Sequence, residues 1–202
     1  MERSIVPEER LIDLQLTKEM QERFCEANDL YTMCLDSQKR TIGELYGTEE
    51  EKAFIKGRVP EELYRELLER LYATEVEDMI EEPLAEENIK LCGAVIRMGG
   101  KPIAVWIVFA VLSDIGEIPE DMPKTMGTTS ADHFYKSMRF LTTLSRQYFA
   151  AKIDEAFAQE ASVKSIEEKE RAEAELKRNE AMSAIVQEIV SEREFTETAK
   201  SI

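Results

Sequence analysis

Hydrophobic residues recur at helical spacing near the start of the chain. Through residues 11–28 they are interspersed with charged residues such as Lys18, Glu19 and Glu22, which predicts an amphipathic helix. The expected apolar stripe consists of Leu11, Leu14, Leu16, Met20 and Phe24. Asn28 and Asp29 interrupt the pattern, so we expect the helix to end there.

A two-residue alternation follows this helix. Residues 31–36 place every second apolar side chain on one face and predict a strand. The turn at 37–40 leads into a second predicted strand at 41–46. Residues 88–98 and 101–113 are the strongest strand patterns in the chain, so we expect the sheet to be built around them.

Two glycines, Gly99 and Gly100, separate these last two strands. A glycine pair adopts the positive φ values of a tight hairpin turn, so we expect the two strands to pair directly. The strand at 101–113 is apolar on both faces, which predicts a central position covered from both sides. The pattern at 76–84 is ambiguous and is compatible with one further short strand.

Two short helices are expected between the first strands and the later ones. Thr48 stands at an N-cap position, and Glu51 three residues later completes a capping box. Pro60 suits the first turn of the next helix, where its missing N–H is not needed. The apolar stripe of this second helix is expected to be Leu63, Leu67, Leu68 and Leu71.

After a loop at 115–130, residues 130–194 contain neither glycine nor proline, which predicts one long helix. Its first part carries large apolar residues expected to pack on the domain, namely Phe134, Met138, Leu141, Leu144, Tyr148 and Phe149. Residues 165–180 are nearly all charged, and residues 181–190 are apolar again. Long helices with weak, partly polar seams are usually dimeric coiled coils or connectors.

This order of elements is that of a PAS-type domain. Two segments resemble parts of PocR-type sensory domains. Residues 16–36, with LTKEMQERF followed by ANDLYTMCLD, resemble the opening of these domains. Residues 91–106, with LCGAVI followed by GGKPIAVW, resemble their closing hairpin. Residues 195–202 are similar to the first helix of a GAF domain, cut off at its start. The resemblance implies an α+β fold in which a PAS-like antiparallel sheet with flanking helices is followed by a long C-terminal helix, a coiled-coil linker.

The expected organisation is a PAS-like ligand-binding sensory domain at 1–151, a charged helical linker at 152–194 and the start of a following domain at 195–202. PocR-type domains commonly carry several cysteines after the second strand. Residues 47–83 of this chain contain none, so no metal or redox role tied to such cysteines is expected.

The formal net charge of −16 narrows the choice of partners. It repels phosphate backbones and anionic lipids, so neither nucleic acid nor a membrane is an expected partner. Three cysteines without regular spacing, Cys25, Cys34 and Cys92, are typical of reduced thiols in the cytoplasm. The charged residues 1–10 do not resemble a signal peptide, and the longest apolar run, 103–112, is about half the length of a bilayer-spanning helix.

Few residues suggest catalysis. The one histidine, His133, is either a haem ligand or pH switch or, more plainly, a capping or surface residue. With a single histidine and scattered cysteines, we expect no metal site and no cofactor. The sequence contains no phosphate-binding loop and no nucleophile motif, so we do not expect an enzyme.

A ligand pocket against the sheet is the expected site, with Tyr31, Met33, Cys92, Arg97 and Trp106 as its candidate residues. Small residues at 92–94 leave space near the sheet. Trp106 is able to stack on a ring or a cation, and Arg97 to meet a carboxylate. The alternative is a fully packed core with Arg97 facing solvent at the strand end, and strand parity does not identify which sheet face forms the pocket.

The sequence therefore predicts a cytoplasmic small-ligand-sensing domain of a bacterial signal-transduction protein. It would act as a homodimer through its C-terminal helix and transmit the ligand state to an output domain outside this chain. The alternative is a PAS-like dimerisation and spacer module that binds no ligand.

Overall fold

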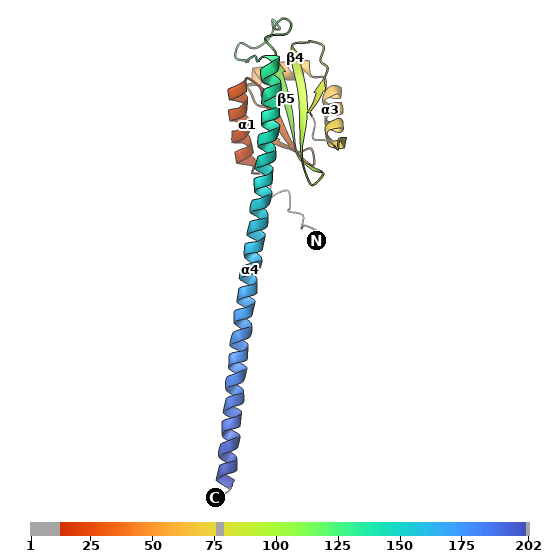
Figure 1. Ribbon diagram of the computed structural model, residues 1–202. Helices are drawn as coiled ribbons and strands as arrows, with labels where there is room; N and C mark the ends of the chain where they lie inside the picture. Colours follow the sequence, from red (N-terminus) through yellow and green to blue (C-terminus); the bar gives the residue numbers. More distant parts are fainter. Residues whose placement is uncertain (1–12, 76–78, 201–202) are drawn as a thin grey trace. The chain divides into compact units, whose positions relative to one another are not determined.

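The computed structural model describes residues 13–75 and 79–200, which form two compact units, Met1–Ile153 and Asp154–Ile202. The first unit holds the sheet and begins with the predicted N-terminal helix (Figure 1). The helices are α1 (Leu14–Asn28), α2 (Glu49–Arg58), α3 (Glu61–Ala73) and α4 (Ala131–Lys200). The strands are β1 (Tyr31–Asp36), β2 (Thr41–Gly43), β3 (Met79–Glu82), β4 (Ile89–Met98) and β5 (Lys101–Val111).

The five strands form one antiparallel sheet in the order β2-β1-β5-β4-β3, with β5 in the centre. The central position of β5, apolar on both faces, is confirmed. Met98 pairs with Lys101 across a two-residue turn, in which Gly99 and Gly100 have φ values of +59° and +82°. Such positive φ values are typical of a tight hairpin turn, and residues with a side chain rarely adopt them. The α+β class and the PAS-like arrangement of sheet and helices are therefore confirmed.

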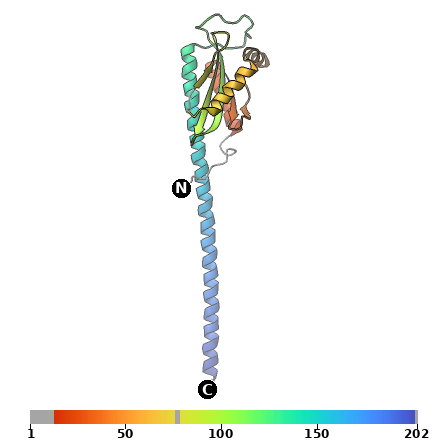
Figure 2. The ribbon, with the colours of Figure 1, turned by 90° about the vertical axis from the view of Figure 1, so that its right-hand side faces the viewer.

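Helices cover both faces of the sheet. In Figures 1 and 2, α1 and the first turns of α4 lie over one face, and α3 lies over the other. The residues that pack together agree with this view, because α1 and α4 contribute to one cluster of buried side chains and α2 and α3 contribute to two others. We call these surfaces the α1/α4 face and the α2/α3 face.

The α1/α4 face is a closed core. The side chains of Ala104, Trp106 and Val108 on β5 are wholly buried there. The stripe of α4 meets them as predicted from the sequence, through Phe134, Met138, Leu141 and Phe149. Three cysteines, Cys25, Cys34 and Cys92, are buried in the same cluster.

On the α2/α3 face, Leu67 and Leu71 of α3 pack against the sheet and are wholly buried. Gly93 makes this close packing possible, because a Cβ at that position would lie 2.3 Å from Leu71 Cδ1. The space that the small residues at 92–94 leave is therefore not a ligand space. Leu71 fills it at Gly93, while Cys92 and Ala94 point into the core of the opposite face.

The apolar stripe expected on the N-terminal helix is wrong in its first half. Leu14 and Leu16 are exposed, whereas Thr17 and Gln21 are buried together with Phe24 and Cys25. Gln21 is buried because its side-chain amide donates hydrogen bonds to the main-chain oxygens of Thr32 (2.5 Å) and Glu44 (2.7 Å). Leu11, the first residue of the expected stripe, lies outside the described residues.

Strand β2 is shorter than the predicted strand at 41–46, because it ends at Gly43. The bond from Gln21 takes the carbonyl of Glu44, which a continuing strand would present to its neighbour. The register also shifts between Cys34 and Leu35, which marks an irregularity in the pairing of β1 with β2. The short strand suspected at 76–84 is β3, and Val76 lies outside the described residues.

The start of α2 follows the predicted capping. Glu51 N donates to Thr48 Oγ1 (3.3 Å) and Thr48 N donates to Glu51 Oε2 (2.7 Å), which confirms the capping box of α2. At the start of α4, Ser130 Oγ accepts from the main-chain N–H of His133 (3.2 Å). The side chain of His133 is exposed, which agrees with the expectation of a capping or surface residue.

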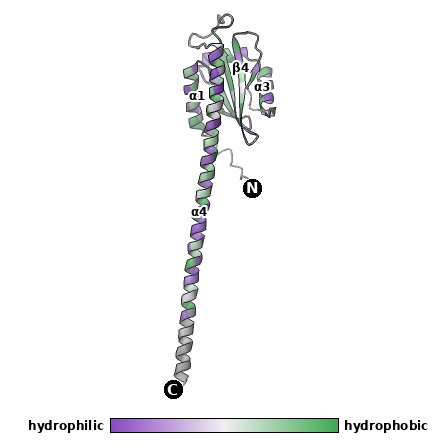
Figure 3. Ribbon diagram, viewed as in Figure 1, coloured by the Kyte–Doolittle hydropathy of each residue, from purple (hydrophilic) through white to green (hydrophobic). Residues whose placement is uncertain are grey.

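In the second unit, Asp154–Ile202, the described residues 154–200 are a continuation of α4. The coloured part of this ribbon is largely hydrophilic with isolated hydrophobic positions (Figure 3). Among the residues of this unit whose side chains are described, five large apolar ones are more than half exposed, namely Val163, Ile166, Leu176, Met182 and Ile185. The predicted following domain at 195–202 lies partly outside the described residues.

Candidate ligand cavity on one face of the sheet

The α2/α3 face contains an open cavity of about 830 Å³. Its floor is the sheet, and its walls are α2, α3 and the segment that follows β2. This volume lies within the range of about 300–1,000 Å³ that is usual for small-molecule sites. The main lining residues are Tyr31, Met33, Leu45, Ile55, Val59, Tyr64, Leu91, Ile107 and Phe109.

The floor of the cavity is apolar and comes from three adjacent strands. Tyr31 on β1 pairs with Phe109 on β5, which pairs with Leu91 on β4. Residues in register on neighbouring strands share a face, so these side chains project to the same side. Met33 and Ile107, paired in the same way, extend the floor by one step.

The opposite wall consists of Ile55 on α2, Tyr64 on α3 and Val59 in the short connection between the two helices. Tyr64 lies three, four and seven residues before Leu67, Leu68 and Leu71, so it shares their side of α3. Its hydroxyl donates a weak hydrogen bond to Met33 Sδ at 3.4 Å. The wall thus places the hydroxyl of Tyr64 beside the apolar floor of the cavity.

Charged side chains stand among the remaining lining residues. Lys52 pairs with Glu49 (2.9 Å), and Lys56 is exposed. Three glutamates, Glu44, Glu49 and Glu61, stand against these two lysines, so the lining carries a formal charge of −1 (two positive and three negative groups). Charge therefore does not favour an anionic ligand.

The five residues expected at the site separate into two groups. Tyr31 and Met33 line the cavity. Cys92 and Trp106 lie on the α1/α4 face, and Arg97 lies near the hairpin turn between β4 and β5. The structure therefore brings only Tyr31 and Met33 together at this cavity, and their role in binding remains a prediction.

Trp106 has a structural environment on the α1/α4 face. Its ring is wholly buried, and its indole N–H donates a hydrogen bond to Ser145 Oγ on α4 (2.9 Å), which is also wholly buried. A buried indole N–H without a partner would be costly, so this bond fixes the contact between β5 and α4. Residues Ile107 and Trp106 are adjacent in sequence, so β5 touches the cavity on one side and α4 on the other.

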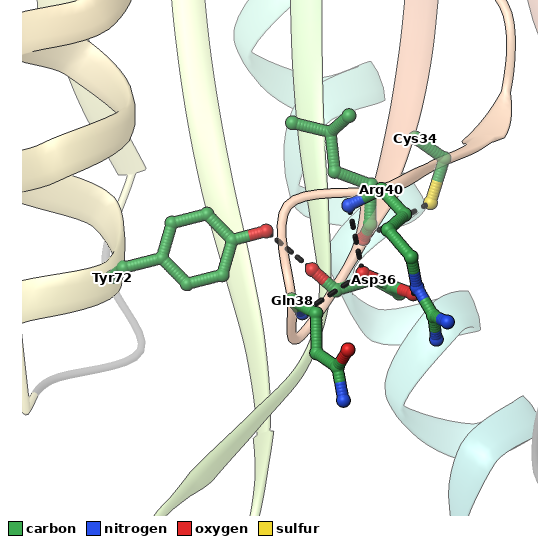
Figure 4. A network of polar contacts seen from close by, with 6 residues as sticks. Cys34, Asp36, Gln38, Arg40 and Tyr72 are labelled. Atoms are coloured by element: carbon green, nitrogen blue, oxygen red, sulfur yellow. Dashed lines mark hydrogen bonds and ion pairs between the residues drawn. The ribbon is translucent and has the colours of Figure 1, made fainter.

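Arg97 is largely buried, not facing solvent, because its guanidinium donates to two main-chain oxygens. These are the carbonyl oxygens of Gly100 (2.9 Å) and Tyr72 (3.0 Å). The Tyr72 hydroxyl in turn donates to the main-chain oxygen of Asp36, at the end of β1 (Figure 4). The end of α3 is thereby tied to both hairpins of the sheet.

The buried carboxylate of Asp36 holds the turn between β1 and β2. It accepts hydrogen bonds from the main-chain N–H groups of Gln38 and Arg40 (both 2.8 Å) and from Arg40 Nε (2.6 Å), as Figure 4 shows. Lys39 in this turn has φ of +63°, a conformation that the surrounding bonds stabilise. Both the carboxylate and the main-chain oxygen of Asp36 are thus hydrogen-bonded within the domain, which indicates a structural role.

A second hollow of about 910 Å³ lies between α1, β2 and the start of α2. It shares Tyr31, Glu44, Leu45 and Lys52 with the cavity on the α2/α3 face. The hydroxyl of Tyr31 accepts a hydrogen bond from Gly127 N (3.0 Å). Burial is the main cause that raises the pKa of Tyr31 to about 12, so this hydroxyl stays neutral at ordinary pH.

The three buried cysteine thiols are poorly reactive. Burial raises the pKa of Cys25 to about 11 and that of Cys92 to about 12, and it raises the pKa of Cys34 well above its usual value. Within residues 13–75 and 79–200, no group of three or more histidine, cysteine or acidic side chains is arranged to hold a metal ion. None of the described helices has an apolar stretch that would cross a bilayer.

Sequence reasoning missed most of the cavity wall. Ile55 and Tyr64 lie on helices that were expected from the sequence, and Val59 lies between these helices, but none of the three was assigned to the site. The spacing of Tyr64 relative to the leucines of α3 is a signal that would have placed it on the inward side. Leu91, Ile107 and Phe109 required the strand register, which the sequence does not supply.

No protein family and no curated protein matches the sequence. Among solved structures, the chain is similar to one described as an RNA-binding light-oxygen-voltage receptor, with 14% identity and a TM-score of 0.30. The match covers 57% of this chain and 35% of that receptor. RNA binding and light-oxygen-voltage sensing are what the description says of that receptor.

Proposed function

We propose that the first unit is a sensory domain that binds a small molecule in the cavity on the α2/α3 face. The observation that carries the proposal is the position of β5. Its residues Ile107 and Phe109 line the cavity, while Trp106, next to Ile107 in the sequence, points to the opposite face and packs against α4. A ligand that shifts β5 would therefore bias the packing of α4, within the limit set by its different affinities for the two states.

The proposed domain is a cytoplasmic, PocR-type module of a bacterial signal-transduction protein. The residue patterns at 16–36 and 91–106 support the PocR type, and the three free, buried cysteines support a reducing compartment. The partial GAF-like segment at 195–202 supports an output domain beyond this chain.

The proposed output is a parallel homodimer formed through α4. The support is the group of exposed apolar side chains between Val163 and Ile185, which a single helix leaves in water. Light scattering of the full chain tests this proposal. A dimer that becomes monomeric in the double variant Ile166→Glu and Leu176→Glu is expected, and a wild-type monomer would contradict it.

A binding role is proposed in preference to catalysis. The described thiols and the histidine support a binding role, because the three thiols are buried with raised pKa values and His133 is exposed at the start of α4. The same exposed side chains on α4 also favour a second candidate function, a ligand-free dimerisation and spacer module.

A thermal-shift screen of uncharged apolar metabolites separates the two functions. A ligand at about 100 times its Kd stabilises the folded state by roughly 2.7 kcal/mol, which corresponds to a rise in Tm of several degrees. The variant Met33→Trp fills the cavity and should abolish any hit, whereas Phe140→Trp at an exposed position of α4 should not. Hits that persist in Met33→Trp would contradict the proposed site.

A further inference from the structure

Tyr64 differs from other tyrosines of the domain in its hydrogen-bond partner. The hydroxyl of Tyr135 donates to a carboxylate oxygen of Glu81 (2.7 Å), and that of Tyr72 donates to the main-chain oxygen of Asp36. The hydroxyl of Tyr31 accepts from Gly127 N. The partner of the Tyr64 hydroxyl is the thioether sulfur of Met33, at 3.4 Å.

A thioether is a weak acceptor, so this hydroxyl retains most of its capacity to donate to an oxygen. It also stays protonated, because burial raises the pKa of Tyr64 above its ordinary value. The cavity wall thus presents a neutral donor that a ligand oxygen would satisfy better than Met33 does.

The surroundings limit the chemistry of that oxygen. The nearby floor is apolar, with Ile107 and Phe109 buried, which favours an aromatic or aliphatic body. The formal lining charge of −1, from two lysines and three glutamates, does not compensate an anion. An uncharged carbonyl oxygen fits a phenol donor without this difficulty.

We propose that Tyr64 determines ligand specificity, and that the cavity takes an uncharged, mainly apolar molecule whose carbonyl oxygen accepts the hydrogen bond of Tyr64 in place of Met33 Sδ. This inference rests on the proposed sensory function of the same cavity. It adds the class of ligand and the residue that selects it.

Two probes of nearly equal shape test the proposal, 2-acetylnaphthalene and 2-ethylnaphthalene, with equilibrium dialysis against the full chain. A neutral hydrogen bond is expected to favour the acetyl probe by about 3- to 10-fold. In Tyr64→Phe this preference should disappear while the ethyl probe binds as before. In the control Tyr135→Phe, on the other side of the sheet, the preference should remain.

A second variant protects the test against a change in folding. Met33→Leu removes the competing sulfur, so the preference for the acetyl probe should be kept or increase. Equal binding of both probes to the wild type, or a preference that survives Tyr64→Phe, would overturn the role of Tyr64 and leave the cavity as a site. Binding of neither probe would overturn the ligand class inferred here, whereas the sensory function itself is tested by the thermal-shift screen and its Met33→Trp control.

Discussion

The two faces of one sheet are built differently although they share the same strands. On the α1/α4 face, Trp106 and Ser145 are wholly buried and hydrogen-bonded to each other. On the α2/α3 face, the neighbouring residue Ile107 borders a cavity of about 830 Å³, and the hydroxyl of Tyr64 in the cavity wall donates to the sulfur atom of Met33 on the floor. A closed core and an open cavity are thus separated by a single step along β5.

The largest expected effect tests the closed character of the α1/α4 face. Trp106→Ala removes a buried ring and leaves Ser145 without its partner, so it should lower the free energy of unfolding by about 3–5 kcal/mol. Phe140→Ala is the control, because Phe140 lies on α4 but is 59% exposed, and it should change stability by less than about 1 kcal/mol. Urea denaturation measures the free energy of unfolding of both variants. Similar losses in the two would contradict the closed packing around Trp106.

Thiol reactivity distinguishes the faces directly. The three native cysteines lie in the α1/α4 core, and burial raises the pKa of Cys25 to about 11. At pH 8 they should react with a disulfide reagent at least about 100-fold more slowly than a cysteine introduced by Met33→Cys at the cavity.

The raised pKa of Cys25 also makes the free energy of unfolding depend on pH. Since the folded-state pKa of Cys25 is raised above the ordinary value of 9.0, its contribution to stability is present below about pH 9 and is lost as the pH rises toward 11. Fast labelling of the native thiols at pH 8 in the folded protein would contradict the closed core.

Two glycine substitutions should have opposite effects on stability. Gly93→Ala forces a Cβ to within 2.3 Å of buried Leu71 Cδ1, so it should destabilise the protein by about 1–3 kcal/mol. Gly57→Ala lies in α2, where a Cβ would meet no atom within 4 Å, and it should stabilise the protein by about 0.5–1 kcal/mol. Equal signs in thermal unfolding would show that α3 does not pack on β4 as described.

The smallest effect concerns the wall of the cavity. Thr48→Ala removes the side-chain oxygen that accepts from Glu51 N, which should cost about 1 kcal/mol. Because α2 forms a wall and not the closed core, the loss should appear as faster hydrogen exchange in residues 49–58. Faster exchange mainly in residues 131–153 would instead contradict the distinction between the two faces of the sheet.

Much of the fold was predictable because local patterns carry it. The alternation at 31–36, the glycine pair at 99–100 and the capping box at Thr48 all depend on a few neighbouring residues, and the structure confirms them. Gln21 shows where such patterns fail. Its burial depends on carbonyl groups of Thr32 and Glu44, which are distant in sequence.

The site was less predictable for a related reason. Tyr31 and Met33 were placed by parity, but parity alone does not say which face is closed by a helix. Trp106 was expected to meet a ligand because it is large and distinctive, and it meets Ser145, 39 residues further along the chain. The choice between the two roles depends on which helix covers which face, a long-range property of the packing.

Hydrogen exchange of the full chain with and without 2-acetylnaphthalene tests the central claim most directly, that a ligand in the cavity affects α4 through β5. The account predicts slower exchange in α2 and α3 together with altered exchange in residues 131–153 of α4. Slower exchange in α2 and α3 with unchanged exchange in α4 would contradict it, because the cavity would then be occupied without any effect on the helix.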